Sequence, residues 1–246
     1  DLTRRLVHHE FEVLRSLHVR DPMSVPSALG LVHAGENVGL VLSPLELWHL
    51  HRRPRHAPPA AIVRSIAEIV RPSARAVLAK SRFVSDIAVL ADDPNVAHGP
   101  TLRRALDHLL GAFADESVAF GTSHGDFSPW NTLRTGHRIA IWDWERCRDD
   151  VPVGIDHLHY VTQQQARRPI ESLPSVATSD FATSRPALLA LGLEAHLIDP
   201  FVTLYYADLL ARYERDSQGG DAPGLRAMRD TVERALRARL DRGQTP

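Results

Sequence analysis

The sequence predicts an α+β fold in which helices outweigh strands. Helical periodicity of apolar residues runs through most of the chain, whereas short β-type runs gather in two regions, 28–42 and 118–144. The chain has 246 residues, of which 43% are hydrophobic and 24% charged, as in an ordinary globular protein. A chain of this length can bury a sizeable core without disulfide bonds.

The first predicted element is an amphipathic helix over residues 3–18, which Asp21-Pro22 terminates. Its apolar stripe consists of Leu2, Leu6, Val13 and Leu17. Glu10 falls on this stripe, either as a charge at the edge of the helix or as an inward-pointing carboxylate with a partner. The helical pattern is already under way at Asp1, which predicts that upstream material is missing from this sequence.

Two short strands, Ala28–His33 and Val38–Leu42, are predicted next. Gly35-Glu36-Asn37 between them is typical of a hairpin turn, and Ser43-Pro44 ends the second strand. From about residue 46 the chain is predicted to be mainly helical. The expected helices are 60–70, 74–91, 101–114, 201–215 and 225–240.

Charge and cysteine usage exclude several classes of protein. The chain carries 29 basic and 30 acidic residues, a balance that argues against a dedicated nucleic-acid binder or a polybasic membrane anchor. No apolar run approaches the ~18 residues of a membrane span. Cys147 is the only cysteine, so no internal disulfide or cysteine-based zinc site is possible, and we expect a cytoplasmic location. Nothing in the sequence predicts an oligomeric state.

The segment that carries chemistry reads His124-Gly125-Asp126-Phe127-Ser128-Pro129-Trp130-Asn131, and Ile141-Trp142-Asp143-Trp144-Glu145 follows it. Thr132–Arg134 and Arg138–Trp142 are expected to form a hairpin. That hairpin would bring Asn131 and Asp143 side by side, with Asp126 on the loop leading in. We therefore expect three oxygen-bearing side chains to converge.

Phosphoryl transfer requires a set of this kind. Mg²⁺ is a hard cation that prefers carboxylate, amide and phosphate oxygens. One carboxylate and one amide can hold it, while a further carboxylate accepts the proton of the attacking hydroxyl. Catalysis is then mostly positioning and neutralisation of charge.

These residues resemble the aminoglycoside phosphotransferase family, which has a protein-kinase-like fold. The resemblance implies that Asp126 is the catalytic base and that His124 braces the catalytic loop. It also implies that Asn131 and Asp143 bind Mg²⁺, and that Glu145 reaches a second metal ion. The implied reaction is transfer of the γ-phosphoryl group of ATP to a hydroxyl of a small molecule. The family covers antibiotics, sugars, choline-like alcohols and alcohols derived from amino acids, so the acceptor cannot be deduced from the motif.

The resemblance extends more weakly to the N-terminal region. Glu10 would be the small-lobe glutamate that pairs with a phosphate-binding lysine, and Ser43–Leu45 would be the hinge that meets adenine through backbone groups. The expected domains are a truncated small lobe over 1–44 and a mainly helical large lobe, with the catalytic hairpin, over 45–246. The family's glycine-rich loop and lysine strand would precede Asp1, and Lys80, the only lysine, cannot replace that lysine from its predicted helix.

Two other functions compete with this one. A catalytically silent, kinase-like binding module would share the motifs but would transfer nothing. Gly121-Thr122-Ser123-His124-Gly125 also satisfies the nucleophile-elbow pattern of serine hydrolases, with Ser123 as nucleophile. An elbow needs a helix directly after its serine, and Pro129 would break that helix.

Overall fold

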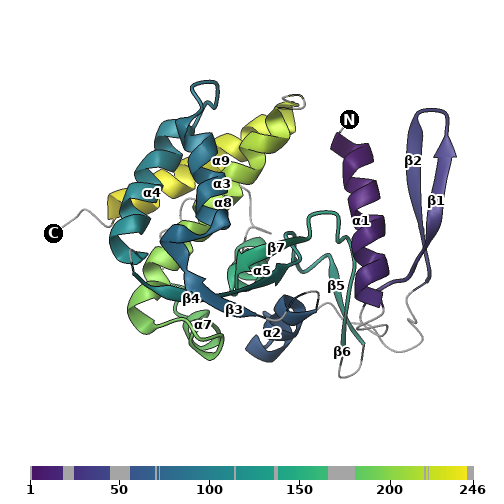
Figure 1. Cartoon of the computed structure of the whole chain (residues 1–246), viewed down its shortest axis with the longest axis horizontal. Helices are drawn as coiled ribbons and strands as arrows, with labels where there is room; N and C mark the ends of the chain where they lie inside the picture. Colours follow the sequence, from purple (N-terminus) through teal and green to yellow (C-terminus); the bar gives the residue numbers. More distant parts are fainter. Residues whose placement is uncertain are drawn as a thin grey trace. The chain divides into compact units, whose positions relative to one another are not determined.

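The computed structural model describes residues 2–18, 25–44, 56–69, 71, 73–113, 115–135, 138–165, 181–218, 220 and 222–242. Helix α1 (Leu2–His18) packs beside a two-stranded antiparallel sheet of β1 (Ala28–Ala34) and β2 (Asn37–Leu42) (Figure 1). The helix and hairpin agree with the sequence prediction. Gly35 occupies the turn with a φ of 61°, a conformation in which glycine meets no steric penalty.

The chain divides into two compact units. The first consists of Asp1–Ser73 and Phe120–Val161, and the second of Ala74–Ala119 and Thr162–Pro246. The predicted lobes, 1–44 and 45–246, are a separate division that stays a prediction.

The first unit also contains helix α2 (Ala60–Glu68) and most of the second β-type region. The end of β4 (Ser117–Ser123) pairs antiparallel with β7 (Arg148–Pro152), and β5 (Thr132–Thr135) pairs antiparallel with β6 (Arg138–Ile141). Helix α5 (Ile155–Gln165) begins directly after β7.

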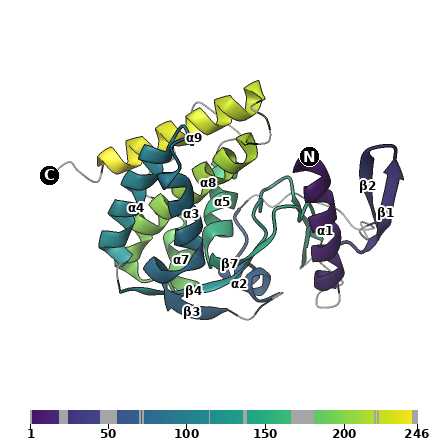
Figure 2. The same ribbon diagram turned by 45° about the horizontal axis from the view of Figure 1, so that its top comes forward.

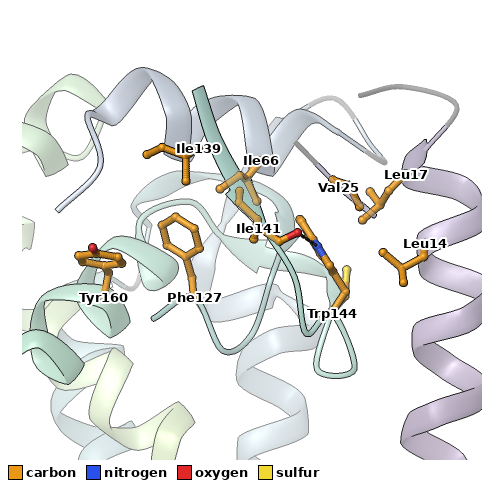
Figure 3. Packing of buried hydrophobic residues seen from close by; sticks show 10 residues of the cluster. Leu14, Leu17, Val25, Ile66, Phe127, Ile139, Ile141, Trp144 and Tyr160 are labelled. Carbon is orange, nitrogen blue, oxygen red and sulfur yellow. Dashed lines mark hydrogen bonds between the residues drawn. The ribbon is translucent and has the colours of Figure 1, made fainter. Parts of the chain in front are cut away.

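A core of aromatic and aliphatic side chains stabilises the first unit. Trp144, Phe127 and Tyr160 are fully buried in it (Figure 3). Leu14 and Leu17 of α1 belong to the same cluster, so the apolar face of α1 is the face that the unit buries. The indole N–H of Trp144 donates to the carbonyl of Ile141 at 3.2 Å. The residues flanking the predicted site therefore rest on a packed core.

The second unit is mainly helical. Helices α3 (Arg82–Asp92), α4 (Gly99–Phe113), α8 (Ile198–Ser217) and α9 (Pro223–Arg242) pack against one another (Figure 2). The remaining short elements are β3 (Ala74–Val77), η1 (Leu78–Lys80), α7 (Arg185–Ala190) and η3 (Ala195–Leu197). Buried Val232, Leu236 and Leu240 show that α9 uses its apolar side for packing.

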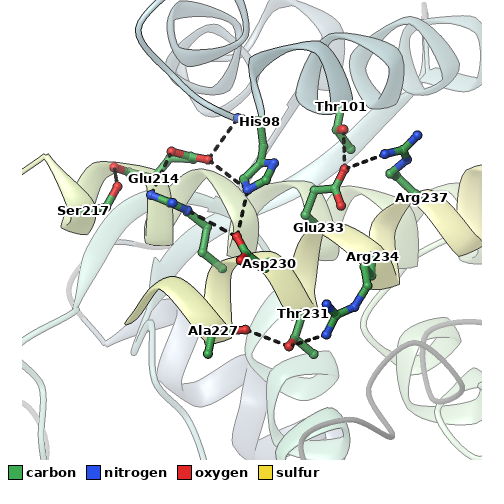
Figure 4. A network of polar contacts seen from close by, with 11 residues as sticks. His98, Thr101, Glu214, Ser217, Ala227, Asp230, Thr231, Glu233, Arg234 and Arg237 are labelled. Atoms are coloured by element: carbon green, nitrogen blue, oxygen red, sulfur yellow. Dashed lines mark hydrogen bonds and ion pairs between the residues drawn. The ribbon is translucent and has the colours of Figure 1, made fainter. Parts of the chain in front are cut away.

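Charged side chains connect these helices. Glu214 of α8 is buried, accepts a hydrogen bond from the backbone N–H of His98 at 3.2 Å and lies 3.8 Å from Arg229 of α9 (Figure 4). The His98 ring contacts Asp230 at 3.3 Å. Both of these acids therefore lie beside cationic or ionisable nitrogen groups.

One predicted helix is wrong over nearly half of its length, because the α-helix begins only at residue 82. Residues 74–91 were expected to be helical, but 74–77 form strand β3, which is hydrogen-bonded to β4. The N–H of Leu78 donates to the carbonyl of Glu116, which continues this association. Ser81 then caps α3 by accepting from the N–H of Val84, so the helix begins at residue 82. Pairing with a distant strand overrode the local periodicity, and Lys80 lies in η1.

Candidate active site

The loop 124–131 connects β4 to β5 and is anchored by the first turn of α5. One carboxylate oxygen of Asp156 accepts from the backbone N–H of His124 at 2.9 Å. The other accepts from the Ser123 hydroxyl at 2.8 Å and the Gly125 N–H at 3.2 Å. A buried carboxylate that accepts from several donors of one loop holds that loop firmly, because hydrogen bonds to a charged group are strong.

His124 connects this loop to the segment after β6. Its ring is fully buried, and Nδ1 accepts from the N–H of Asp126 at 3.2 Å. With Nδ1 an acceptor, the proton lies on Nε2, which donates to the carbonyl of Trp142 at 3.0 Å. Burial lowers the pKa of His124, which favours this neutral form. The imidazole also packs on the Trp144 ring, with centroids 4.5 Å apart.

Gly125 allows two backbone segments to approach closely. Its φ is 80°, and a Cβ at this position would lie 2.1 Å from the carbonyl oxygen of Arg146. Only glycine satisfies both conditions. The loop that carries Asp126 is therefore pressed directly against the chain that follows Asp143.

Asp126 lies at the centre of a set of polar contacts. Asn131 Nδ2 donates to Asp126 Oδ2 at 2.9 Å and to the Asp126 carbonyl at 3.0 Å. His159 Nε2 lies 2.9 Å from Asp126 Oδ1. The Asp126 side chain retains 26% of its exposure, so a carboxylate held at both oxygens still meets solvent.

The hairpin brings Asn131 and Asp143 together as predicted. Thr132 pairs with Ile141, and the N–H of Trp142 donates to the carbonyl of Asn131 at 3.2 Å. The Asn131 side chain lies near enough to the Asp143 carboxylate to favour its ionised form. Asp143 has a φ of 69°, a left-handed conformation that is uncommon outside glycine and is maintained only where the surroundings enforce it. The three oxygen-bearing side chains expected to converge therefore do so.

Negative charge is concentrated at this point. Burial raises the pKa of Asp143, and the neighbouring Asp126 carboxylate raises it further. The pKa of Glu145 is also raised, first by burial and then by Asp143, although Arg146 lies 3.6 Å from the Glu145 carboxylate and opposes the shift. Acids whose ionised forms are disfavoured by their neighbours gain stability when a cation joins them.

Glu10 reaches the same segment from α1. Its Oε1 accepts from the N–H of Trp144 at 3.0 Å. Burial raises its pKa to about 6, this hydrogen bond opposes the rise, and the charges of Asp143 and Glu145 add to it. The structure thus gives Glu10 a backbone partner next to Asp143, a contact that the sequence did not reveal.

The other residues of the predicted nucleotide site lie elsewhere or outside the described residues. Ser43 closes the β1–β2 hairpin: its N–H donates to the carbonyl of Ser27, and the N–H of Ser27 donates to the Ser43 hydroxyl, each at 2.9 Å. Leu45 lies outside the described residues.

Ser123 does not have the geometry of a hydrolase nucleophile. It lies in strand β4, is buried, and donates its hydroxyl to Asp156. Residues 124–131 form turns and loop where a nucleophile elbow requires a helix. Cys147 is likewise buried, and burial raises the pKa of its thiol.

His159 is the residue of this site that the sequence analysis did not assign. In the sequence, His157 and His159 are two of 14 histidines and carry no recognisable motif. The useful signal was the spacing from Asp156: residues three apart in a helix share a face, so one side of α5 presents both Asp156 and His159 to the loop.

Among the described residues, no three or more His, Cys, Asp or Glu side chains lie close enough together to hold a metal ion by themselves. Within the same ranges, no helix combines the length and the apolar character that crossing a bilayer demands.

Known structures share this fold. No family model and no curated protein sequence matches the chain. The choline kinase LicA from Streptococcus pneumoniae superposes with a TM-score of 0.56 at 13% identity, over 98% of this chain and 83% of the kinase. A thermostable mutant of the aminoglycoside phosphotransferase APH(4)-Ia, in ternary complex with ADP and hygromycin B, gives a TM-score of 0.57 at 14% identity, over 98% and 84%. The fold is therefore α+β and kinase-like, and the predicted resemblance to the aminoglycoside phosphotransferases is confirmed at the level of the fold.

Proposed function

We propose that this chain is a small-molecule kinase that transfers the γ-phosphoryl group of ATP to a hydroxyl. The observation that carries the proposal is the convergence of Asp126, Asn131 and Asp143 in the first unit, where Asn131 donates to Asp126 and both lie near the Asp143 carboxylate. The shared fold supports it, since one neighbour is a choline kinase and another is a phosphotransferase in complex with ADP and hygromycin B.

Asp126 would act as the base. Its carboxylate is held at both oxygens and retains exposure to solvent, so an acceptor hydroxyl can approach it. The acceptor oxygen bonds to the γ-phosphorus while the bond from that phosphorus to the β–γ bridging oxygen breaks. ADP leaves with the electron pair of that bond, and the hydroxyl proton passes to Asp126.

Asn131 and Asp143 fit a magnesium ion. They supply one amide and one carboxylate at the end of the same hairpin, and the raised pKa of Asp143 shows that its negative charge is disfavoured in the protein alone, which a cation would relieve. When bound, Mg²⁺ would neutralise phosphate charge. Two protein ligands suffice, because nucleotide phosphates and water complete the coordination of this ion. Glu145, two residues after Asp143, would reach a second ion.

The remaining predicted site residues would hold the catalytic loop in place and bind the nucleotide. His124 would brace the loop through its contacts with Asp126 and Trp142. Glu10 would fix the backbone after Asp143 and would pair with a phosphate-binding lysine. Ser43 and Leu45 would meet adenine; because the Ser43 N–H donates to Ser27, its carbonyl oxygen is the group of Ser43 that would have to serve.

Mg-ATP turnover by the purified chain tests the proposal. Release of ADP and ³¹P NMR of the products would be followed with aminoglycosides, amino sugars and choline-like alcohols as acceptors. We expect Asp126→Asn to lower kcat about 1,000-fold while nucleotide binding persists. We expect Asp143→Asn to weaken Mg²⁺-dependent nucleotide binding at least about tenfold.

Asp107→Asn, an exposed acid on α4, is the matched control and should behave as the wild type. Mg²⁺-dependent nucleotide binding without any transfer would instead identify a silent binding module. Equal binding of Mg-ATP by the wild type and Asp143→Asn would show that the metal ligands are misassigned.

A further inference from the structure

His159 is buried in α5 and ends against the proposed base. Its side chain retains 3% of its exposure, and Nε2 lies 2.9 Å from Asp126 Oδ1. A buried imidazole is costly unless its polar atoms find partners. The position of this ring is therefore coupled to the position of the Asp126 carboxylate.

The two oxygens of Asp126 are divided between two donors. Asn131 Nδ2 donates to Oδ2, and His159 approaches Oδ1 from the other side. Two donors on different oxygens fix the plane of a carboxylate, whereas a single donor leaves it free to rotate about the Cβ–Cγ bond.

Helix α5 thus holds the loop at two levels. Asp156 accepts from the backbone N–H groups of His124 and Gly125, and His159, one turn further along the helix, contacts the side chain of Asp126. The neighbouring His157 differs: among the described residues its two buried ring nitrogens have no hydrogen-bond partner, and burial lowers its pKa to about 4. The same helix therefore supplies one histidine to the site and one to packing.

We infer that His159 is a positioning residue for phosphoryl transfer, an inference that rests on the proposed function: its Nε2–H donates to Asp126 Oδ1 and orients the carboxylate toward the acceptor hydroxyl. The proton of that hydroxyl passes to Asp126, and the proton on Nε2 stays in place. A misplacement of about 1 Å in a reacting group can cost about 100-fold in rate. Loss of His159 should therefore lower kcat rather than weaken binding of the nucleotide.

Two substitutions of His159 and one of its neighbour test the inference. His159→Leu removes both ring nitrogens at similar volume, and His159→Gln retains an N–H near the place of Nε2. We expect kcat to fall about 10- to 100-fold in His159→Leu, with the KM for ATP changed less than about twofold. His159→Gln should recover kcat to within about threefold of the wild type, because the donor is restored. His157→Leu, with the same change two residues away, should stay within about twofold of the wild type.

A double-mutant cycle separates positioning from general damage. Because His159 acts through Asp126, adding His159→Leu to Asp126→Asn should lower kcat by less than about twofold more. Ring ¹⁵N signals give a readout that needs no turnover: Asp126→Asn should move those of His159 and leave those of His157 in place.

The outcomes are distinguishable. A wild type that transfers phosphoryl groups, together with a His159→Leu variant of unchanged kcat, would overturn this inference alone. Equal losses in His159→Leu, His159→Gln and His157→Leu would also overturn it, because they would indicate a purely structural role. A wild type without any transfer would overturn the proposed function and this inference together.

Discussion

The candidate site and the helical network of the second unit differ in how closely their acids are matched by cationic groups. In the first unit, Glu10 and Asp156 accept from backbone N–H groups, and Asp143 lies beside a like charge. In the second unit, Glu214 lies beside Arg229 and Asp230 contacts His98 (Figure 4). Backbone N–H groups hold a carboxylate in place but leave its net negative charge, whereas a neighbouring cation neutralises that charge.

This difference distinguishes paired charges from concentrated like charges. Paired charges on packed helices fix how the helices meet, and their fields largely cancel. Concentrated like charges are unfavourable in the protein alone and become favourable when a cation binds, which is why shifted pKa values gather at functional sites. The first unit therefore retains the property that binding of Mg-ATP would require.

The largest expected effect tests the close backbone approach between Gly125 and Arg146 at the site. Gly125→Ala should lower the free energy of unfolding by about 3–5 kcal/mol, because a Cβ would meet the carbonyl of Arg146 at 2.1 Å in a left-handed backbone. Denaturant unfolding followed by tryptophan fluorescence reports on the first unit, which contains all four tryptophans. Gly30→Ala, where a Cβ meets nothing within 4 Å, is the control and should change stability by less than about 1 kcal/mol.

Glu214→Gln tests the charge pairing of the second unit. Loss of one partner leaves the Arg229 charge beside a neutral amide, so the free energy of unfolding should fall by about 2–3 kcal/mol. Far-UV circular dichroism of the helices would measure this. Glu194→Gln changes an exposed acid of the same unit and should have almost no effect. A stabilised Glu214→Gln variant would remove the contrast between the two regions.

Glu10 provides a pH-dependent test. Burial raises its pKa from 4.5 to about 6, so the folded chain binds this proton more tightly than the unfolded chain. The stabilising contribution is fully present below about pH 4.5 and is lost as the pH rises through about 6. Between these limits, the stability of the wild type relative to Glu10→Gln should fall by about 1 kcal/mol, a value reduced for solvent screening.

Unfolding at several pH values without Mg²⁺ would measure this difference. Glu12→Gln, an exposed change on the same helix, should show no such trend. A Glu10→Gln variant that parallels the wild type at every pH would contradict the proposed burial of this carboxylate.

The smallest expected effect is a gain in stability, whereas the substitutions of Gly125 and Glu214 lower it. Asp143→Asn should raise the free energy of unfolding by about 0.5 kcal/mol without Mg²⁺, because it removes a carboxylate whose pKa burial and Asp126 raise. Asparagine also tolerates the left-handed backbone. Asp150→Asn is matched in φ, at 57°, but loses an ion pair with Arg71 at 2.5 Å and should give no gain. Thermal unfolding of both variants would decide whether the charge at Asp143 opposes folding.

The sequence alone predicted the parts of the site that depend on residues close together in the chain. The register of the β5–β6 hairpin places Asn131 across from Trp142, so a local pairing brings Asn131 close to Asp143, the next residue. The helix over α1 and the β1–β2 hairpin also follow from short-range patterns of apolar and turn residues.

Tertiary structure decided the contacts between residues far apart in sequence. The pairing of β3 with β4 overrode a helical pattern, and Glu10 met the N–H of Trp144 across 134 positions. His159 reached Asp126 only because α5 is packed beside the loop. Residue spacing fixes geometry within one turn or hairpin, where few dihedral angles intervene, but a distant contact depends on how every element between the two residues packs. The sequence therefore identifies most of the candidate site residues, and the folded structure determines which contacts hold each of them in place.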